Sequence, residues 1–195
     1  MFLRGTLTNE LFQTISKIIS FILYQKLLRD KAIMKKKLNL GCGSDYKEGW
    51  VNLEDTGEYI DVKYKADIFH NLNKYPYPFK ANEFDLILAS HVAEHLDNPV
   101  KFFKECKRLL TNKGELIVIV PHYTNPMAYT PLHKTYWSYK SMRHAASGLK
   151  IKEVKLNFTP KYKFVEWIAR RFPVFYENTP LRMFPAKEIE AVYCK

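Results

Sequence analysis

Two glycines separated by one residue, Gly41 and Gly43, follow an apolar run in the segment "KLNLGCG". Glycine at the end of a strand lets the chain turn sharply and lets a ligand approach the backbone, because no Cβ stands in the way. Tyr46 stands where a dinucleotide fingerprint needs its third glycine, and no Gly-Lys-Ser/Thr follows for a phosphate loop. Glu54, eleven residues after Gly43, suits a ribose diol, since a carboxylate accepts from both hydroxyls. These residues predict a site for a nucleoside without phosphates.

Histidines are the second set of residues with chemical potential, because imidazole gains and loses a proton near neutral pH. Of the six in the chain, four stand at or shortly after the ends of two apolar runs: His91, His95, His122 and His133. The carboxyl edge of a parallel sheet is where such folds bind ligands. His133 and His122 are the first candidates for a base or acceptor-orienting group, with His91 beside them. Tyr136 is expected to line the same pocket.

The remaining residues with reactive or ligating groups are interpreted as structural. Glu94 and His95, in "AEHL", are expected to hold a loop. The three cysteines, among them Cys42 in the glycine turn, show no CxxC spacing, so the sequence predicts neither a zinc site nor any other metal site. Unpaired cysteines and the lack of an evident secretory signal favour a cytoplasmic protein.

Alternating strands and helices must position these groups. Five apolar runs are predicted as strands, at residues 37–41, 50–54, 64–68, 84–90 and 115–121. A helix over 100–110 lies between the last two, with Asn98 as its N-cap, Pro99 in its first turn and Gly114 ending it. Further on, 138–147 and 162–172 read as helices and 149–158 and 188–195 as strands. This alternation predicts an α/β domain with a seven-stranded, mostly parallel sheet and helices on both faces.

An N-terminal segment precedes this domain. Residues 1–36 are predicted to form an amphipathic helix and a basic lead-in, and 37–195 the domain itself. The formal net charge of +11 divides into +6 over 1–37, −3 over 38–120 and +8 over 121–195. Basic flanks are compatible with an anionic partner, either nucleic acid or a membrane surface. The helix is too short and too interrupted by lysines to span a bilayer. It is expected to pack on the domain or on a second subunit, as in a homodimer, or to make peripheral membrane contact.

The stretch from about Leu38 to Tyr123 resembles the class I methyltransferases that use S-adenosylmethionine. The resemblance is carried by "LNLGCG…GWVNLE", "FDLILASHVAEHL", "NKGELIVIVP" and a late "FPAKEIEAV", in this order. It implies a Rossmann-like three-layer sandwich, S-adenosylmethionine as the cofactor and methyl transfer as the activity. The segment "PLHKTYW", which holds His133 and Tyr136, resembles a stretch that lies over the active site in related enzymes.

The resemblance also implies cofactor-binding residues at the ends of the first four strands. They are Gly41, Cys42, Gly43, Glu54, Asp55, Asp67, Ile68, Ser90 and His91. Glu54 would bind the ribose hydroxyls, with Asp55 as the alternative. Asp67, after the third strand, would meet the adenine amino group beside Ile68. Only about eight residues join the first two strands, which is short for a parallel crossover.

The methyl acceptor is not specified by these motifs. No "NPPY" tetrapeptide follows the fourth predicted strand, which argues against methylation of an exocyclic amino group. Aromatic residues in "KYKFVEWIARRFPVFYE" suit an apolar small-molecule pocket, and their interleaved cations also suit single-stranded RNA. We favour a small-molecule acceptor. The alternatives are an RNA methyltransferase and a non-catalytic S-adenosylmethionine-binding subunit of another enzyme.

Overall fold

The computed structural model describes residues 35–56, 64–146 and 148–195. The chain divides into two compact units, Met1–Lys35 and Lys36–Lys195. The helix predicted within residues 1–36 lies outside the described residues. In the part of the chain that is described, no helix combines the length and the apolar character that crossing a membrane requires.

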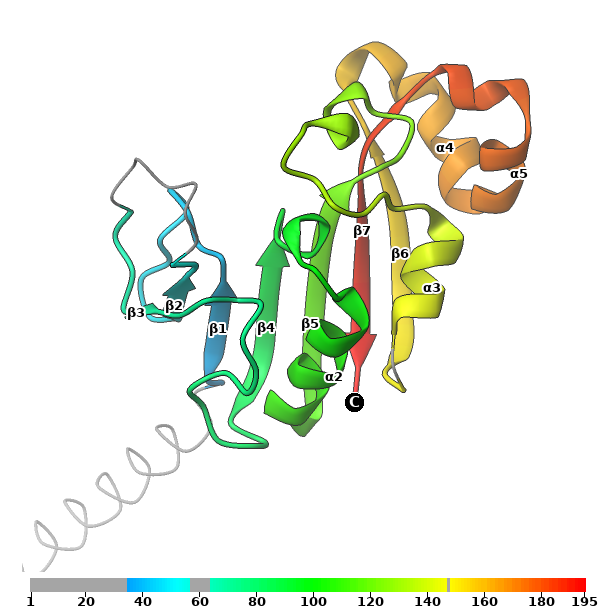
Figure 1. The fold of residues 1–195 in the computed structure, drawn as a ribbon. Coiled ribbons are helices and arrows are strands. Elements are labelled where there is room, and N and C mark those ends of the chain that lie inside the picture. The colour runs from blue at the N-terminus through cyan, green and yellow to red at the C-terminus, as the bar shows by residue number, and fades with distance from the viewer. Residues whose placement is uncertain (1–34, 57–63, 147) are drawn as a thin grey trace, which may run out of the picture. The chain divides into compact units, whose positions relative to one another are not determined.

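A seven-stranded mixed sheet forms the centre of the second unit, in the order β3-β2-β1-β4-β5-β7-β6. The strands are β1 Lys37–Leu40, β2 Val51–Glu54, β3 Ile68–Phe69, β4 Phe84–Ser90, β5 Leu110–Pro121, β6 Lys150–Phe158 and β7 Ala186–Cys194. The first five are parallel, and β7 runs antiparallel between β5 and β6. Figure 1 shows this order across the sheet. The prediction of a Rossmann-like, mostly parallel seven-stranded sheet is confirmed.

The helices lie mainly on the β4–β6 half of the sheet (Figure 1). They are α2 Pro99–Leu109, α3 Tyr139–Ala145, α4 Lys163–Arg171 and α5 Pro173–Asn178, with short 3-10 turns η1 Ala93–His95, η2 Pro126–Tyr129, η3 Pro160–Tyr162 and η4 Pro180–Met183. No helix lies between β1 and β2, where the described chain makes only turns. The short connection noted in the sequence therefore carries a loop instead of a crossover helix.

Local signals explain where α2 begins but not where it ends. The Asn98 side chain accepts from the Lys101 N–H at 3.0 Å and Pro99 occupies the first turn, as predicted. The helix ends at Leu109, so the prediction that Gly114 ends it is wrong. Gly114 lies inside β5, where a Cβ would meet the Phe84 carbonyl oxygen at 3.0 Å. Glycine is needed at position 114 because β4 and β5 approach closely where their pairing register is irregular.

Three other predicted elements are confirmed within one or two residues, and one is not. The helices over 138–147 and 162–172 correspond to α3 and α4, and the strand over 149–158 to β6. The strand predicted at 64–68 is wrong, because β3 begins only at Ile68. Apolar side chains from every strand except β3 enter one buried core, with Leu40, Ile87 and Val118 at its centre. That core holds the carboxyl ends of β1, β4 and β5 at one edge.

Candidate active site

The glycine turn after β1 has two glycines with different tasks. Both have left-handed backbones, with φ of 61° at Gly41 and 49° at Gly43. A Cβ on Gly41 would lie 2.5 Å from Val92 Cγ2, so this glycine allows the turn to pack against the loop after β4. A Cβ on Gly43 would meet nothing within 4 Å. The backbone at Gly43 is therefore open to a ligand, as the sequence predicted for this turn.

Glu54 ends β2 directly beside this turn. Its carboxylate is only 6% exposed and its Oε2 accepts a short hydrogen bond from the Gly43 N–H. The Cys42 N–H donates to the Leu53 carbonyl at 3.1 Å, which ties the two strand ends together. A buried acid and an open backbone thus lie at one corner of the sheet, as the ribose assignment of Glu54 requires.

Cys42 and Asp55 have structural contacts in this corner. The Cys42 thiol is buried, and burial raises its pKa to about 12, which keeps it protonated and unreactive. Asp55 accepts from the Leu72 N–H at 3.0 Å and so holds the segment after β3. One oxygen of Asp55 is thereby engaged by the protein, as one oxygen of Glu54 is by Gly43.

Asp67 does not follow the third strand, as the resemblance implied, but directly precedes it at Ile68. Its Oδ2 accepts from the Asn52 backbone N–H at 2.7 Å, and its Oδ1 accepts from the Tyr46 hydroxyl at 2.8 Å. These hydrogen bonds hold the pKa of the Asp67 carboxyl below its usual value. The carboxylate is exposed and ionised. Its two hydrogen bonds also connect β2 to the glycine loop.

Ser90 and His91 stand at the carboxyl end of β4, next to the glycine turn. His91 has a left-handed backbone, with φ of 56°, and its N–H donates to the Ile119 carbonyl of β5 at 2.8 Å. Its imidazole lies 3.3 Å from a Glu94 oxygen and 3.8 Å from Glu188. The hydrogen bond with Glu94 raises the pKa of His91.

His122 does not reach a pocket, and the expectation that it acts directly on an acceptor is corrected. Its side chain is completely buried. One ring nitrogen lies 2.8 Å from Thr124 Oγ1 and the other 3.1 Å from Glu177 Oε1, so both are occupied. Glu177 also accepts from the Tyr139 N–H at 2.6 Å. His122 is a positioning residue that holds Glu177 and the start of α3.

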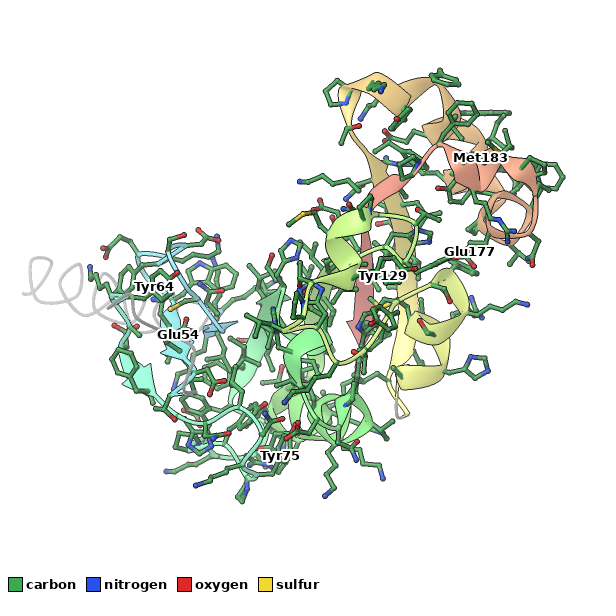
Figure 2. All side chains as sticks on the ribbon, turned by 45° about the horizontal axis from the view of Figure 1, so that its top comes forward. Glu54, Tyr64, Tyr75, Tyr129, Glu177 and Met183 are labelled. Carbon is green, nitrogen blue, oxygen red and sulfur yellow. The ribbon has the colours of Figure 1, made fainter. Side chains whose placement is uncertain are left out.

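An aromatic groove of about 440 Å³ opens beside the end of β5. Its lining includes Tyr123, Tyr129, Tyr136, Trp137, Glu177 and Arg182. The rings of Tyr129 and Tyr136 stack at 5.0 Å, and both are more than half exposed. Figure 2 shows Glu54 toward β2 and Tyr129, Glu177 and Met183 toward the β5–β7 half, so the two parts of the site flank the end of β4.

His133 lies in the segment that brings Tyr136 to this groove. Its Nδ1 lies 3.0 Å from the Ala128 carbonyl, and its ring packs edge-on against His95 with centroids 4.7 Å apart. Tyr136 lines the groove as predicted. His91 and His133 therefore both lie close to Glu94, whereas His122 is buried inside the domain.

Residues 38–118 match the family model described as "Methyltransferase domain". A structure of an S-adenosylmethionine-dependent methyltransferase from Archaeoglobus fulgidus superposes with a TM-score of 0.59 at 14% identity, covering 89% of this chain and 93% of that one. A Thermotoga maritima structure, named as such a methyltransferase and "possible histamine N-methyltransferase", gives 0.55 at 15%, covering 94% and 97%. Residues 38–118 therefore resemble a methyltransferase domain, and the described unit has the fold of these methyltransferase structures.

A sequence relative supports the same part of the chain. The uncharacterized protein MJ0638 of Methanocaldococcus jannaschii is 54% identical over 95 residues, which are 43% of this chain. The match spans 39% of that relative's length. S-adenosylmethionine is the methyl donor of the methyltransferase family that residues 38–118 match. The Gly43–Glu54 corner lies within the stretch that matches this family model.

Sequence analysis did not identify several residues around the candidate site. Arg182, Tyr129 and Glu177 line the groove, and Glu188 flanks His91. Tyr129 precedes the segment "PLHKTYW", and the other three come from the last third of the chain, where the aromatic segment 161–177 suggested a pocket but singled out none of them. An alternating strand that begins with acids, in "AKEIE", was the available signal for Glu188.

Proposed function

We propose that this protein transfers the methyl group of S-adenosylmethionine to a small-molecule acceptor bound in the aromatic groove. The observation that carries the proposal is the Gly43–Glu54 corner of a methyltransferase domain, where an open backbone and a buried carboxylate face the same place. The residues present fit a nucleoside-bearing cofactor, because the space a Cβ would take at Gly43 is empty.

The chain's own residues would hold the cofactor along the strand ends. Gly41 and Gly43 let it approach the backbone, Glu54 accepts from its ribose hydroxyls, and Asp67 and Ile68 lie toward the adenine. Ser90 and His91 lie at the end of β4, toward its methionine part. When bound, S-adenosylmethionine supplies an activated methyl group with a neutral sulfur leaving group. The protein's contribution is to align the acceptor and exclude water.

The groove's side chains support a flat acceptor with an anionic group. Tyr129 and Tyr136 offer stacked ring faces, and Arg182 and Lys140 place cations along the same lining. Arginine pairs well with carboxylates and phosphates. His91 and His133, which both lie near Glu94 after β4, are proposed to orient the acceptor or take up its proton.

A second candidate acceptor, single-stranded RNA, is favoured by one surface on α4 and α5. Phe164, Trp167 and Phe175 are each more than half exposed there, and Lys161 and Arg171 lie over neighbouring aromatic rings. Exposed rings beside cations suit base stacking. Quenching of the Trp167 fluorescence by oligonucleotides, lost in Trp167→Phe, would favour RNA over the groove-bound small molecule.

Calorimetric titration with S-adenosylmethionine, NAD and ATP tests the cofactor assignment. Micromolar binding of S-adenosylmethionine alone is expected, followed by transfer of labelled methyl to an acceptor from a small-molecule extract. Binding of NAD or ATP instead would overturn the proposal. Cofactor binding without transfer to any small molecule or RNA would favour a non-catalytic subunit.

A further inference from the structure

Three side chains with metal-ligating atoms converge shortly after the end of β4. Glu94 and His95 come from η1, directly after β4, and His133 comes from the segment between η2 and α3. One potential ligand atom from each lies within 4.8 Å of the other two. Ligand atoms that share one zinc ion at about 2.0–2.2 Å lie at most about 4 Å apart. A small adjustment of side chains would therefore bring the three onto one cation.

Both histidines hold the tautomer that a metal ligand needs. His95 Nδ1 lies 3.2 Å from the Leu132 carbonyl oxygen, and His133 Nδ1 lies 3.0 Å from the Ala128 carbonyl oxygen. A carbonyl only accepts, so each Nδ1 carries the proton and each Nε2 keeps a lone pair. Such backbone contacts on the second nitrogen are typical of metal-bound histidines, since they fix the ring and raise its basicity.

Glu94 has a buried oxygen that the described structure does not explain. The side chain is 1% exposed, and its Oε1 lies 3.3 Å from His91 Nδ1. Its Oε2 is buried without a hydrogen-bond partner among the described residues. A buried, unsatisfied carboxylate oxygen is costly, and a bound cation would remove that cost.

Backbone hydrogen bonds connect the two segments that carry the cluster, independently of any bound ion. The N–H groups of Lys134 and Thr135 both donate to the Glu94 carbonyl, at 2.7 and 3.2 Å. These contacts fix η1 against the segment that carries His133. The three ligands are therefore presented from two elements joined by direct hydrogen bonds, which lowers the ordering cost of binding.

We propose that Glu94, His95 and His133 form a binding site for a first-row divalent cation such as Zn²⁺. Two imidazoles and one carboxylate match the ligand set of zinc sites that keep a position open, and neutral nitrogen donors select against Mg²⁺ and Ca²⁺. The open position takes water or an acceptor oxygen. The acceptor role rests on the proposed function. An oxygen held there loses its proton more readily, so His133 would act as a ligand and not as a free base.

Metal binding can be measured without any acceptor. Tag-free full-length protein, treated with chelator and dialysed, is titrated with Zn²⁺ by calorimetry, and metal content is then determined after gel filtration. One Zn²⁺ per chain is expected, and Co²⁺ should give the visible absorption of a low-coordinate nitrogen–oxygen site. His133→Ala and Glu94→Gln should each weaken Zn²⁺ binding at least about tenfold. Circular dichroism of metal-free samples confirms that the variants fold.

The matched control is His144→Ala. His144 is an exposed histidine on α3 whose Nδ1 also faces a backbone carbonyl, that of Lys140 at 2.8 Å, but it lies outside the cluster. Its variant should bind Zn²⁺ as the wild type does. Wild-type affinity in both His133→Ala and Glu94→Gln, or stoichiometric loss in His144→Ala, would overturn the site. Zn²⁺ binding without S-adenosylmethionine binding would refute the proposed function alone, and the reverse result would refute the cation site alone.

Discussion

The Gly43 N–H donates a hydrogen bond to the Glu54 carboxylate, and this bond joins the turn after β1 to the end of β2. It places an open stretch of backbone beside a buried acid. The pairing also makes the corner sensitive to any side chain at position 43, even though the protein itself leaves that space empty.

Gly43→Ala should weaken S-adenosylmethionine binding at least tenfold, because the new Cβ occupies the ligand's side of the turn. Gly49→Ala is the matched control, since Gly49 also has a left-handed backbone, with φ of 76°, and open space at its Cβ position. Both variants carry about 1 kcal/mol of backbone strain. Calorimetry separates strain from obstruction: equal loss of affinity in the two variants would contradict the assignment.

Asp67→Asn should lower the free energy of unfolding at pH 7 and have a smaller effect in acid. The hydrogen bonds from Asn52 and Tyr46 hold the Asp67 pKa below its ordinary value, so its ionised form stabilises the fold. That contribution is complete above the ordinary carboxyl pKa of about 3.9 and is lost as the pH falls through the lowered pKa. Urea unfolding at pH 7 and below about pH 4 measures the difference.

For that experiment, Asp45→Asn serves as the control, because its carboxylate is largely exposed and pairs with Lys47. It should change the free energy of unfolding little at either pH. A deficit in Asp67→Asn that stays constant across the whole pH range would show that charge is not its cause.

Arg108→Ala should destabilise the domain by about 2–3 kcal/mol, a value reduced for its partial exposure. Arg108 donates to both oxygens of the buried Glu105, at 2.6 and 2.9 Å, and Glu105 accepts from the Tyr77 N–H at 2.7 Å. Removal of the arginine leaves a carboxylate buried without its counter-ion. Urea unfolding compares it with Lys104→Ala, an exposed position on the same helix. An equal loss of unfolding free energy in the two variants would show that the hydrogen bonds of Arg108 to Glu105 do not stabilise the domain.

Tyr136→Ala should raise the KM for the acceptor and leave cofactor affinity unchanged. The substitution removes one of the two stacked rings of the groove but no residue of the glycine turn. Steady-state kinetics with an identified acceptor measures the KM of the variant and of the wild type. Calorimetry measures their affinity for the cofactor. An unchanged KM would place the acceptor outside the groove.

Sequence reasoning succeeded where function depends on local backbone. The glycine turn, the Asn98 cap and the apolar run of β4 are decided by neighbouring residues, and each was found. Contacts between residues that are distant in the sequence were not predicted. The burial of His122 depends on Glu177, 55 positions away, and the cluster of Glu94, His95 and His133 depends on how the segment after β5 folds back. Spacing along the chain carries no information about such contacts.

The last strand of the sheet, β6, has consequences for association between chains. It is an outer strand of nine residues, and an exposed strand edge is a template for pairing with another molecule. Lys150, Lys152 and Lys155 are distributed along it, with Lys152 and Lys155 in ion pairs. Desolvating these ammonium groups opposes edge-to-edge aggregation. Part of the basic charge in the final third of the chain therefore disfavours extension of the sheet by another strand at this edge.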